Sequence, residues 1–143
     1  MTLPDTTISS NSPSTGLPRV LLADDNPVII SLLTQQLSDR FEVVDGAQDA
    51  EEAISMAEEH QPDAVIIDVQ MPKGGGLRAT EEIHKRVPHA AIVALSGDES
   101  RNVVLSMLDR GAIAYLRKGL PKEELISTVQ RAIDAHSGLA ASS

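Results

Sequence analysis

The chain has no cysteine and no tryptophan, and only one phenylalanine and one tyrosine among its 143 residues. Without cysteine, a disulfide framework and a thiolate zinc site are both excluded. The scarcity of aromatic side chains leaves no platform on which nucleic-acid bases could stack. No run approaches the ~18 consecutive apolar residues of a membrane span, and the N-terminus lacks the layout of a signal peptide. We therefore expect a cytoplasmic protein.

Positive charge is also scarce, because 12 Lys and Arg stand against 21 Asp and Glu, for a net charge of -9. Nucleic-acid affinity comes mainly from neutralising phosphates with Lys and Arg, so this balance argues against direct nucleic-acid binding. An acidic chain instead suits a site that collects a metal ion. The length fits one ordinary domain that buries about two-thirds of its unfolded surface.

Three segments differ in composition along the chain. Residues 1–18 are rich in Ser, Thr and Pro and nearly lack apolar residues, which predicts a disordered N-terminal tail. Residues 137–143, SGLAASS, predict a C-terminal tail or a truncated linker. The folded domain is expected over residues 19–136.

Within the folded part, short apolar runs alternate with stretches of helical periodicity. The runs are too short for helices, and most are too continuous for a sheet wetted on one face. They lie at 19–24, 41–46, 64–68, 90–96 and 112–118, and the helical windows lie at 29–37, 50–57, 80–87, 104–108 and 125–133. Such alternation predicts a doubly wound α/β domain, a five-stranded parallel sheet with helices on both faces.

Residues typical of helix ends support these windows. Asn26 followed by Pro27 predicts an N-cap with proline at the first helical position, and Pro121 suggests the same start for the last helix. Gly111 and Gly138 stand where the last two helices are expected to stop.

Polar side chains collect where the predicted strands end. Asp24 and Asp25 follow the first strand, Asp68 ends the third, Ser96 ends the fourth and Lys118 ends the fifth. In a doubly wound sheet the ligand site lies outside the carboxyl ends of the strands, so these side chains should converge. Three carboxylates pressed together need a cation, and an oxygen-only set favours Mg²⁺.

This collection suits phosphoryl transfer. The apolar run AVIID, residues 64–68, would anchor Asp68 rigidly as a nucleophile that accepts a phosphoryl group. Lys118 and the Ser96 hydroxyl can pair with the phosphoryl oxygens. The glycines at 74–76 would let backbone approach the incoming group.

Four motifs carry a resemblance to a known family: DD at 24–25, VIIDVQMP at 65–72, ALSG at 94–97 and YLRK at 115–118. In order and spacing they resemble the receiver domain of two-component response regulators, over residues 19–136. The resemblance implies a flavodoxin-like sheet with strand order 2-1-3-4-5. It also implies a switch that takes a phosphoryl group from a sensor histidine kinase or a phosphotransfer protein, without turning over a small molecule.

The resemblance assigns a role to each matching residue. Asp68 is the phosphoacceptor, Lys118 and Ser96 engage the phosphoryl group, and Mg²⁺ is held by Asp25, Asp68 and the Gln70 backbone carbonyl, with Asp24 acting mostly through water. On phosphorylation Ser96 moves toward the phosphoryl group and Tyr115 turns inward, which repacks the surface of the fourth helix, fifth strand and fifth helix. Gln70 and Asp98 occupy the two positions that tune phosphoryl lifetime.

The chain departs from the family pattern in its loops and its extent. Gly74, Gly75 and Gly76 replace the usual Met-Asp-Gly, which predicts a looser loop. Gly119 follows Lys118 where many receivers have a cis proline. Together with the segments LPKEEL and DNPV, this feature resembles the branch of receivers usually joined to helix-turn-helix DNA-binding domains. Two possibilities stay open: an output domain outside this chain, or a receiver that works alone. Homodimerisation on phosphorylation is a further possibility.

Three other classes share features with this sequence. A pseudo-receiver would keep the fold as a constitutive protein-interaction module and never take up phosphate. A haloacid-dehalogenase-like phosphatase needs a second aspartate two residues after its nucleophile, where this chain has Gln70. A flavodoxin-like flavin binder would place aromatic side chains around the ring, and these are nearly absent.

Overall fold

A computed structural model describes residues 16–97 and 101–142. The predicted tail lies mostly outside these residues, as does Asp98. The elements alternate strictly between strand and helix: β1 Arg19–Ala23, α1 Pro27–Leu37, β2 Glu42–Ala47, α2 Ala50–His60, β3 Ala64–Asp68, α3 Gly75–Arg86, β4 Ala91–Ser96, α4 Arg101–Asp109, β5 Ala114–Arg117 and α5 Lys122–Ser142.

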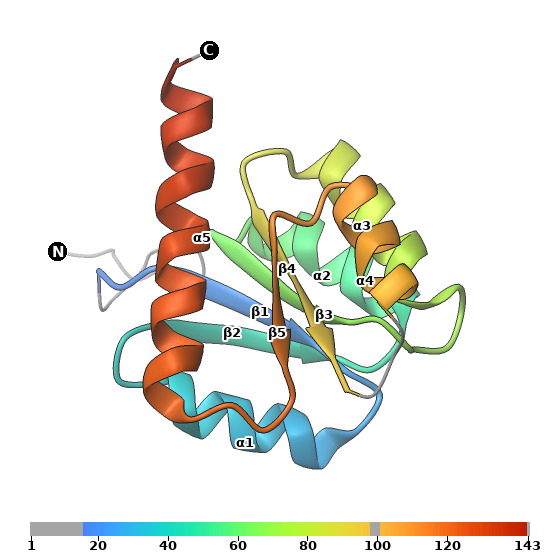
Figure 1. Cartoon of the computed structure of the whole chain (residues 1–143), viewed down its shortest axis with the longest axis horizontal. Helices are drawn as coiled ribbons and strands as arrows, with labels where there is room; N and C mark the ends of the chain where they lie inside the picture. The colour runs from blue at the N-terminus through green and yellow to red at the C-terminus, as the bar shows by residue number, and fades with distance from the viewer. Residues whose placement is uncertain (1–15, 98–100, 143) are drawn as a thin grey trace, which may run out of the picture.

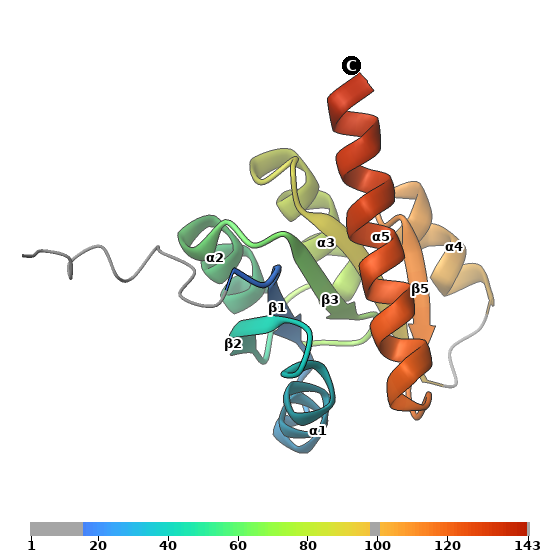
Figure 2. The same ribbon diagram turned by 90° about the vertical axis from the view of Figure 1, so that its left-hand side faces the viewer.

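The five strands form one parallel sheet in the order β2-β1-β3-β4-β5 (Figure 1). Helices α1 and α5 cover one face, and α2, α3 and α4 cover the other (Figures 1 and 2). Apolar side chains fill both layers between helices and sheet, so the central strand β3 is buried along its whole length. The predicted doubly wound fold and its strand order are confirmed.

The register of the sheet brings the strand ends to one level. Ala23 of β1 pairs with Ile67 of β3, so Asp24 leaves the sheet beside Asp68. On the other side of β3, Asp68 pairs with Leu95 of β4, one residue before the end of that strand. Parallel strands thus deliver three consecutive strand ends to the same edge of the sheet.

Helix α1 begins as the sequence indicated. The Asn26 side-chain oxygen accepts a hydrogen bond from the Val28 N–H at 2.9 Å, and Pro27 is the first helical residue. At α5, Pro121 lies one position earlier than predicted, because its carbonyl accepts the Leu125 N–H at 3.0 Å and the helix itself starts at Lys122.

The two predicted helix ends differ in outcome. Gly111 adopts a positive φ of 129° just after α4, where the Ala112 N–H bonds back to the Met107 carbonyl at 3.1 Å. Helix α5, however, continues through Gly138 to Ser142, so the stop predicted at Gly138 is wrong. Residues 137–142 are helical, and their role as a tail or linker stays a prediction. A glycine inside a helix costs only about 1 kcal/mol, which good helix formers on either side offset.

Helix α5 extends beyond the sheet (Figure 1). Among the residues that the structure describes, no helix has both the length and the apolar character needed to cross a bilayer.

Candidate functional site

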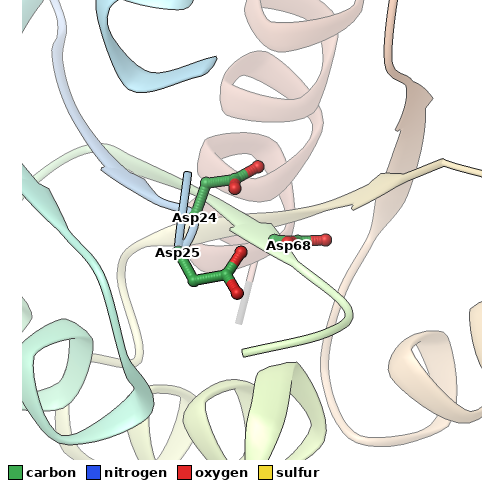
Figure 3. Close-up of side chains that lie close together, drawn as sticks. All are labelled: Asp24, Asp25 and Asp68. Carbon is green, nitrogen blue, oxygen red and sulfur yellow. The ribbon is translucent and has the colours of Figure 1, made fainter. Parts of the chain in front are cut away.

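The five predicted strand-end side chains lie at one edge of the sheet. Asp24 and Asp25 follow β1, Asp68 ends β3, Ser96 ends β4 and Lys118 follows β5. Figure 3 shows the three carboxylates turned toward a common space, and each offers an oxygen within 4.8 Å of the others. Asp24 and Asp68 are almost completely buried, at 1% and 2% exposure, whereas Asp25 is exposed. The sheet thus builds a half-open acidic pocket.

Each buried carboxylate is held at both oxygens in the same way. One oxygen accepts a backbone N–H from two residues further on: Asp24 Oδ1 from Asn26 at 2.9 Å, and Asp68 Oδ1 from Gln70 at 3.3 Å. The other oxygen faces the Lys118 ammonium, at 3.1 Å for Asp24 Oδ2 and 3.4 Å for Asp68 Oδ2. A single lysine therefore serves two buried carboxylates.

The two N–H donors were not singled out from the sequence. Both sit two residues after an aspartate, which is the local pattern by which Asp side chains bond to their own backbone. That pattern is common in loops, so it becomes informative only once the fold brings Asp24 and Asp68 together.

The three carboxylates of the pocket face one lysine, so their negative charge is not fully balanced. Burial, together with the nearby charge of Asp24, raises the pKa of Asp68 to about 6, against the opposing effects of the Gln70 N–H and Lys118. Burial alone would lower the pKa of Lys118, but hydrogen bonds and charge from Asp24 and Asp68 outweigh it, so that pKa is raised. Without a metal ion, Asp68 therefore takes up a proton at a higher pH than an ordinary aspartate does.

The donor set fits Mg²⁺. Three carboxylates face one lysine, their ligand atoms are all oxygen, and they lie close enough to share one ion. The exposed position of Asp25 leaves one side of the site open to the water ligands that Mg²⁺ retains. Asp24, Asp25 and Asp68 are therefore the side chains that would hold the ion, and a contribution from the Gln70 carbonyl stays a prediction.

Ser96 and Tyr115 border a neighbouring hollow. Ser96 is buried, and its carbonyl accepts the Lys118 N–H at 2.8 Å, which ties the end of β4 to the site lysine. The Tyr115 side chain is 52% exposed. Between these two residues lies an open cavity of about 550 Å³, lined on its far side by Val104, Leu105 and Leu108 of α4.

The glycine-rich loop has a defined shape with a steric reason at each position. Lys73, Gly74 and Gly75 adopt positive φ angles of 65°, 109° and 72°. Gly76 packs against the backbone beside Asp68, where a Cβ would press on the Asp68 carbonyl oxygen and lie 2.8 Å from Val69 Cα. The looseness predicted for this loop stays a prediction. Helix α3 starts at Gly75, well before the window at 80–87.

Replacing Lys118 by methionine is expected to destabilise the metal-free protein by about 3 kcal/mol, the lower end for breaking a buried ion pair, because Lys118 is 29% exposed. Within the described residues, it is the one cation that pairs with the two buried carboxylates. Urea unfolding in EDTA measures the loss, and added Mg²⁺ should restore most of it by replacing the missing charge. Lys122→Met is the matched control, since Lys122 pairs at 2.6 Å with the exposed Asp39, which is not one of the pocket carboxylates. Equal effects of the two changes, or no response to Mg²⁺, would contradict this reading.

Fold and site together define a class: a doubly wound α/β domain with an acidic pocket at the carboxyl edge of its sheet. Residues 20–130 match the family model of the response regulator receiver domain. The chain belongs to that family, which confirms the resemblance found in the sequence. Receiver domains are signalling domains of two-component systems, and they bind Mg²⁺ at their acidic pocket.

Similar proteins agree with this assignment. The chain is 40% identical over 117 residues to "Transcriptional regulatory protein PdtaR" of Mycobacterium tuberculosis, covering 80% of this chain and 56% of the relative. It is 36% identical over 115 residues to "Oxygen regulatory protein NreC" of Staphylococcus carnosus, covering 78% and 53%. The chain thus spans about half the length of these relatives.

A solved structure also matches at the level of fold and metal. The receiver domain of the sensor histidine kinase PA1611 from Pseudomonas aeruginosa, described with a magnesium ion in its active-site cleft, aligns with a TM-score of 0.75 and 28% identity. The alignment covers 83% of this chain and 99% of that one.

Proposed function

We propose that this chain is a phosphorylation-dependent switch that accepts a phosphoryl group on Asp68 from a phosphohistidine of a sensor kinase or a phosphotransfer protein. The observation that carries the proposal is the buried Asp68 carboxylate at the sheet edge, with Lys118 at 3.4 Å and two further aspartates beside it. A nucleophile, a cation and a metal-binding set in one pocket are the parts that phosphoryl transfer requires.

In the proposed step, an Asp68 oxygen forms a bond to phosphorus while the phosphorus–nitrogen bond to the donor imidazole breaks. The imidazole nitrogen keeps the electron pair of that bond and is protonated from solvent. The Gln70 N–H fixes the orientation of the Asp68 carboxylate, and Lys118 is within reach of the phosphoryl oxygens. Mg²⁺, when bound by Asp24, Asp25, Asp68 and the Gln70 carbonyl, supplies positive charge against those oxygens.

The switch follows from the new dianion. A phosphoryl group on Asp68 adds negative charge beside Lys118 and near Ser96, whose hydroxyl can donate to it. Movement of Ser96 would leave room for Tyr115 to turn from solvent into the 550 Å³ cavity that both residues border. This shift of population would repack the surface of α4, β5 and α5 and so pass the signal on.

The output controlled by this surface is also part of the proposal. The relatives named above are described as regulatory proteins, one of them transcriptional, and this chain matches only about half of each. We therefore propose that the receiver controls an output domain or partner, including transcription regulation, with homodimerisation on phosphorylation as one route. A cytoplasmic location stays a prediction.

Intact-protein mass after incubation with acetyl phosphate and Mg²⁺ tests the proposal. We expect one phosphoryl adduct, absent in EDTA and absent in Asp68→Asn. Asp134→Asn, a change at an exposed aspartate of α5, is the control and should keep the adduct. A folded, Mg²⁺-binding chain without an adduct would contradict phosphoryl transfer and favour the pseudo-receiver.

A further inference from the structure

The triple-glycine segment raises a question that the proposed function does not answer. Gly74 ends the connection from β3 to α3, and Gly75 and Gly76 are the first two residues of α3. Glycine loses more conformational freedom on folding than any other residue. A functional geometry within a fraction of an ångström needs such a segment to be held by its surroundings. The contacts that hold it are therefore of interest.

Arg78 makes two of these contacts with one guanidinium. Its NH1 group donates a hydrogen bond to the Lys73 carbonyl at 3.0 Å, and its NH2 group pairs with Glu51 Oε2 at 2.6 Å. Arg78 lies in the first turn of α3, and Glu51 lies in the first turn of α2. The planar guanidinium thus links three parts of the structure: α3, the start of α2, and the loop that joins β3 to α3.

Gly74 makes room for this bridge. A Cβ at Gly74 would lie 2.6 Å from Cδ and 2.9 Å from Cβ of Arg78, so the arginine stem runs directly across the glycine. Gly74 also has a φ of 109°, which strongly favours glycine. The position of the Arg78 side chain therefore requires glycine at residue 74.

Two further contacts tie the same loop to the start of α2. The Ala50 N–H donates to the Pro72 carbonyl at 3.1 Å, and the Lys73 ammonium lies 3.9 Å from Asp49 Oδ2. At the end of the segment, the Gly76 N–H donates to the Val69 carbonyl at 3.2 Å. Gly76 lies against the Asp68 carbonyl, so a shift of the loop is passed directly to the phosphoacceptor strand end.

We infer that Arg78 is a positioning residue for the candidate phosphoacceptor site: by bridging the Lys73 carbonyl and Glu51, it fixes the triple-glycine segment and, through Gly76, the backbone that carries Asp68 and Gln70. This inference rests on the proposed function for its meaning. Arg78 itself touches neither the carboxylates nor a phosphoryl group, and its side chain is 41% exposed, so its effect is on geometry more than on global stability.

The chain offers a matched control at the other end of the same helix. Arg86 of α3 also pairs with a glutamate of α2, Glu58, at 3.4 Å, and its side chain is similarly exposed at 45%. It makes no contact with the loop among the described interactions. Arg78→Ala and Arg86→Ala thus remove the same kind of interhelical ion pair. Arg78→Ala also removes the hydrogen bond to the Lys73 carbonyl and the packing on Gly74, whereas Arg86→Ala also removes a pair with Glu82 inside α3.

Two measurements on the full chain test the inference. Hydrogen exchange of the Gly76 amide, followed by NMR in metal-free buffer, should be about 10-fold faster in Arg78→Ala and unchanged in Arg86→Ala. Calorimetric titration with Mg²⁺ alone should show a dissociation constant about 10-fold higher in Arg78→Ala. Arg78→Lys, which keeps a cation but loses the fork, should fall between native and Arg78→Ala, and the urea midpoints of both alanine variants should agree.

The outcomes separate this inference from the proposed function. Identical exchange and Mg²⁺ affinity in Arg78→Ala and Arg86→Ala would overturn the positioning role while leaving phosphoryl transfer intact. Faster Gly76 exchange with unchanged Mg²⁺ affinity would overturn it as well, because the loop would then be decoupled from the site. A native chain that binds Mg²⁺ and forms no adduct would instead contradict the proposed function, and the Arg78 effect on Mg²⁺ affinity would still be measured.

Discussion

Asp68→Asn is expected to raise the free energy of unfolding of the metal-free protein at neutral pH by up to about 3 kcal/mol. The pKa of Asp68 is raised from 3.8 to about 6, and each unit of difference corresponds to about 1.4 kcal/mol. Asparagine keeps an oxygen for the Gln70 N–H and removes the repulsion with Asp24. The phosphoacceptor would thus be a site where function costs stability.

The pH dependence of this gain has a definite sign. The native state binds the Asp68 proton more tightly than the unfolded chain, so ionisation penalises the native state. The penalty is absent below about pH 4, grows as the pH rises toward 6 and is complete above that value. Native and Asp68→Asn proteins should therefore be similarly stable at pH 4 and differ most above pH 6.

Urea unfolding in EDTA across this pH range measures the difference, with Asp109→Asn at an exposed position as control. Saturating Mg²⁺ should narrow or reverse this difference in the free energy of unfolding, because the ion stabilises the protein with the complete set of three aspartates more than the Asp68→Asn variant. An asparagine variant less stable than native at every pH would show that the carboxylate is better accommodated than its burial indicates.

Gly76→Ala is expected to destabilise the protein by about 3 kcal/mol, at the upper end of overpacking costs. The new methyl group would press on the Asp68 carbonyl oxygen and lie 2.8 Å from Val69 Cα. These are backbone atoms, which cannot rotate away as a side chain can, so relief requires displacing the strand end that carries Asp68. Weaker Mg²⁺ binding should accompany the loss.

Gly138→Ala is the matched control for Gly76→Ala. Gly138 also lies in a helix, and an added Cβ would meet nothing within 4 Å. Alanine there should stabilise the protein by up to about 1 kcal/mol through helix propensity. Opposite signs for the two substitutions in urea unfolding are the expected result, and a Gly76→Ala variant within a few tenths of a kcal/mol of native would contradict the close packing.

Much of the site could be predicted because its residues follow strands with strong patterns. The uninterrupted apolar run before Asp68 indicated a strand buried on both faces, and the rule for parallel sheets then placed Asp24, Ser96 and Lys118 at the same edge. Both steps depend on local sequence and on topology. They need no knowledge of individual side-chain contacts.

Other features depend on contacts that no local pattern encodes. The bridge from Arg78 to Glu51 and the Lys73 carbonyl needs the packing of α3 against α2. The start of α3 at Gly75 was missed because glycine usually weakens helices, and here tertiary contacts overrule propensity. At Gly138 the cause is different: an added Cβ would meet nothing within 4 Å, so the continuation of α5 through this glycine depends on its neighbours in the helix.

The position of Lys118 in the chain has a consequence for cooperativity. Asp24 and Asp68 adjoin neighbouring strands β1 and β3, but the ammonium that faces both follows β5, the last strand of the sheet. A partly folded form containing only the first three strands would hold two buried carboxylates with no counter-charge, which is costly. The acidic pocket thus penalises half-formed sheets and favours a chain that is either wholly folded or wholly unfolded.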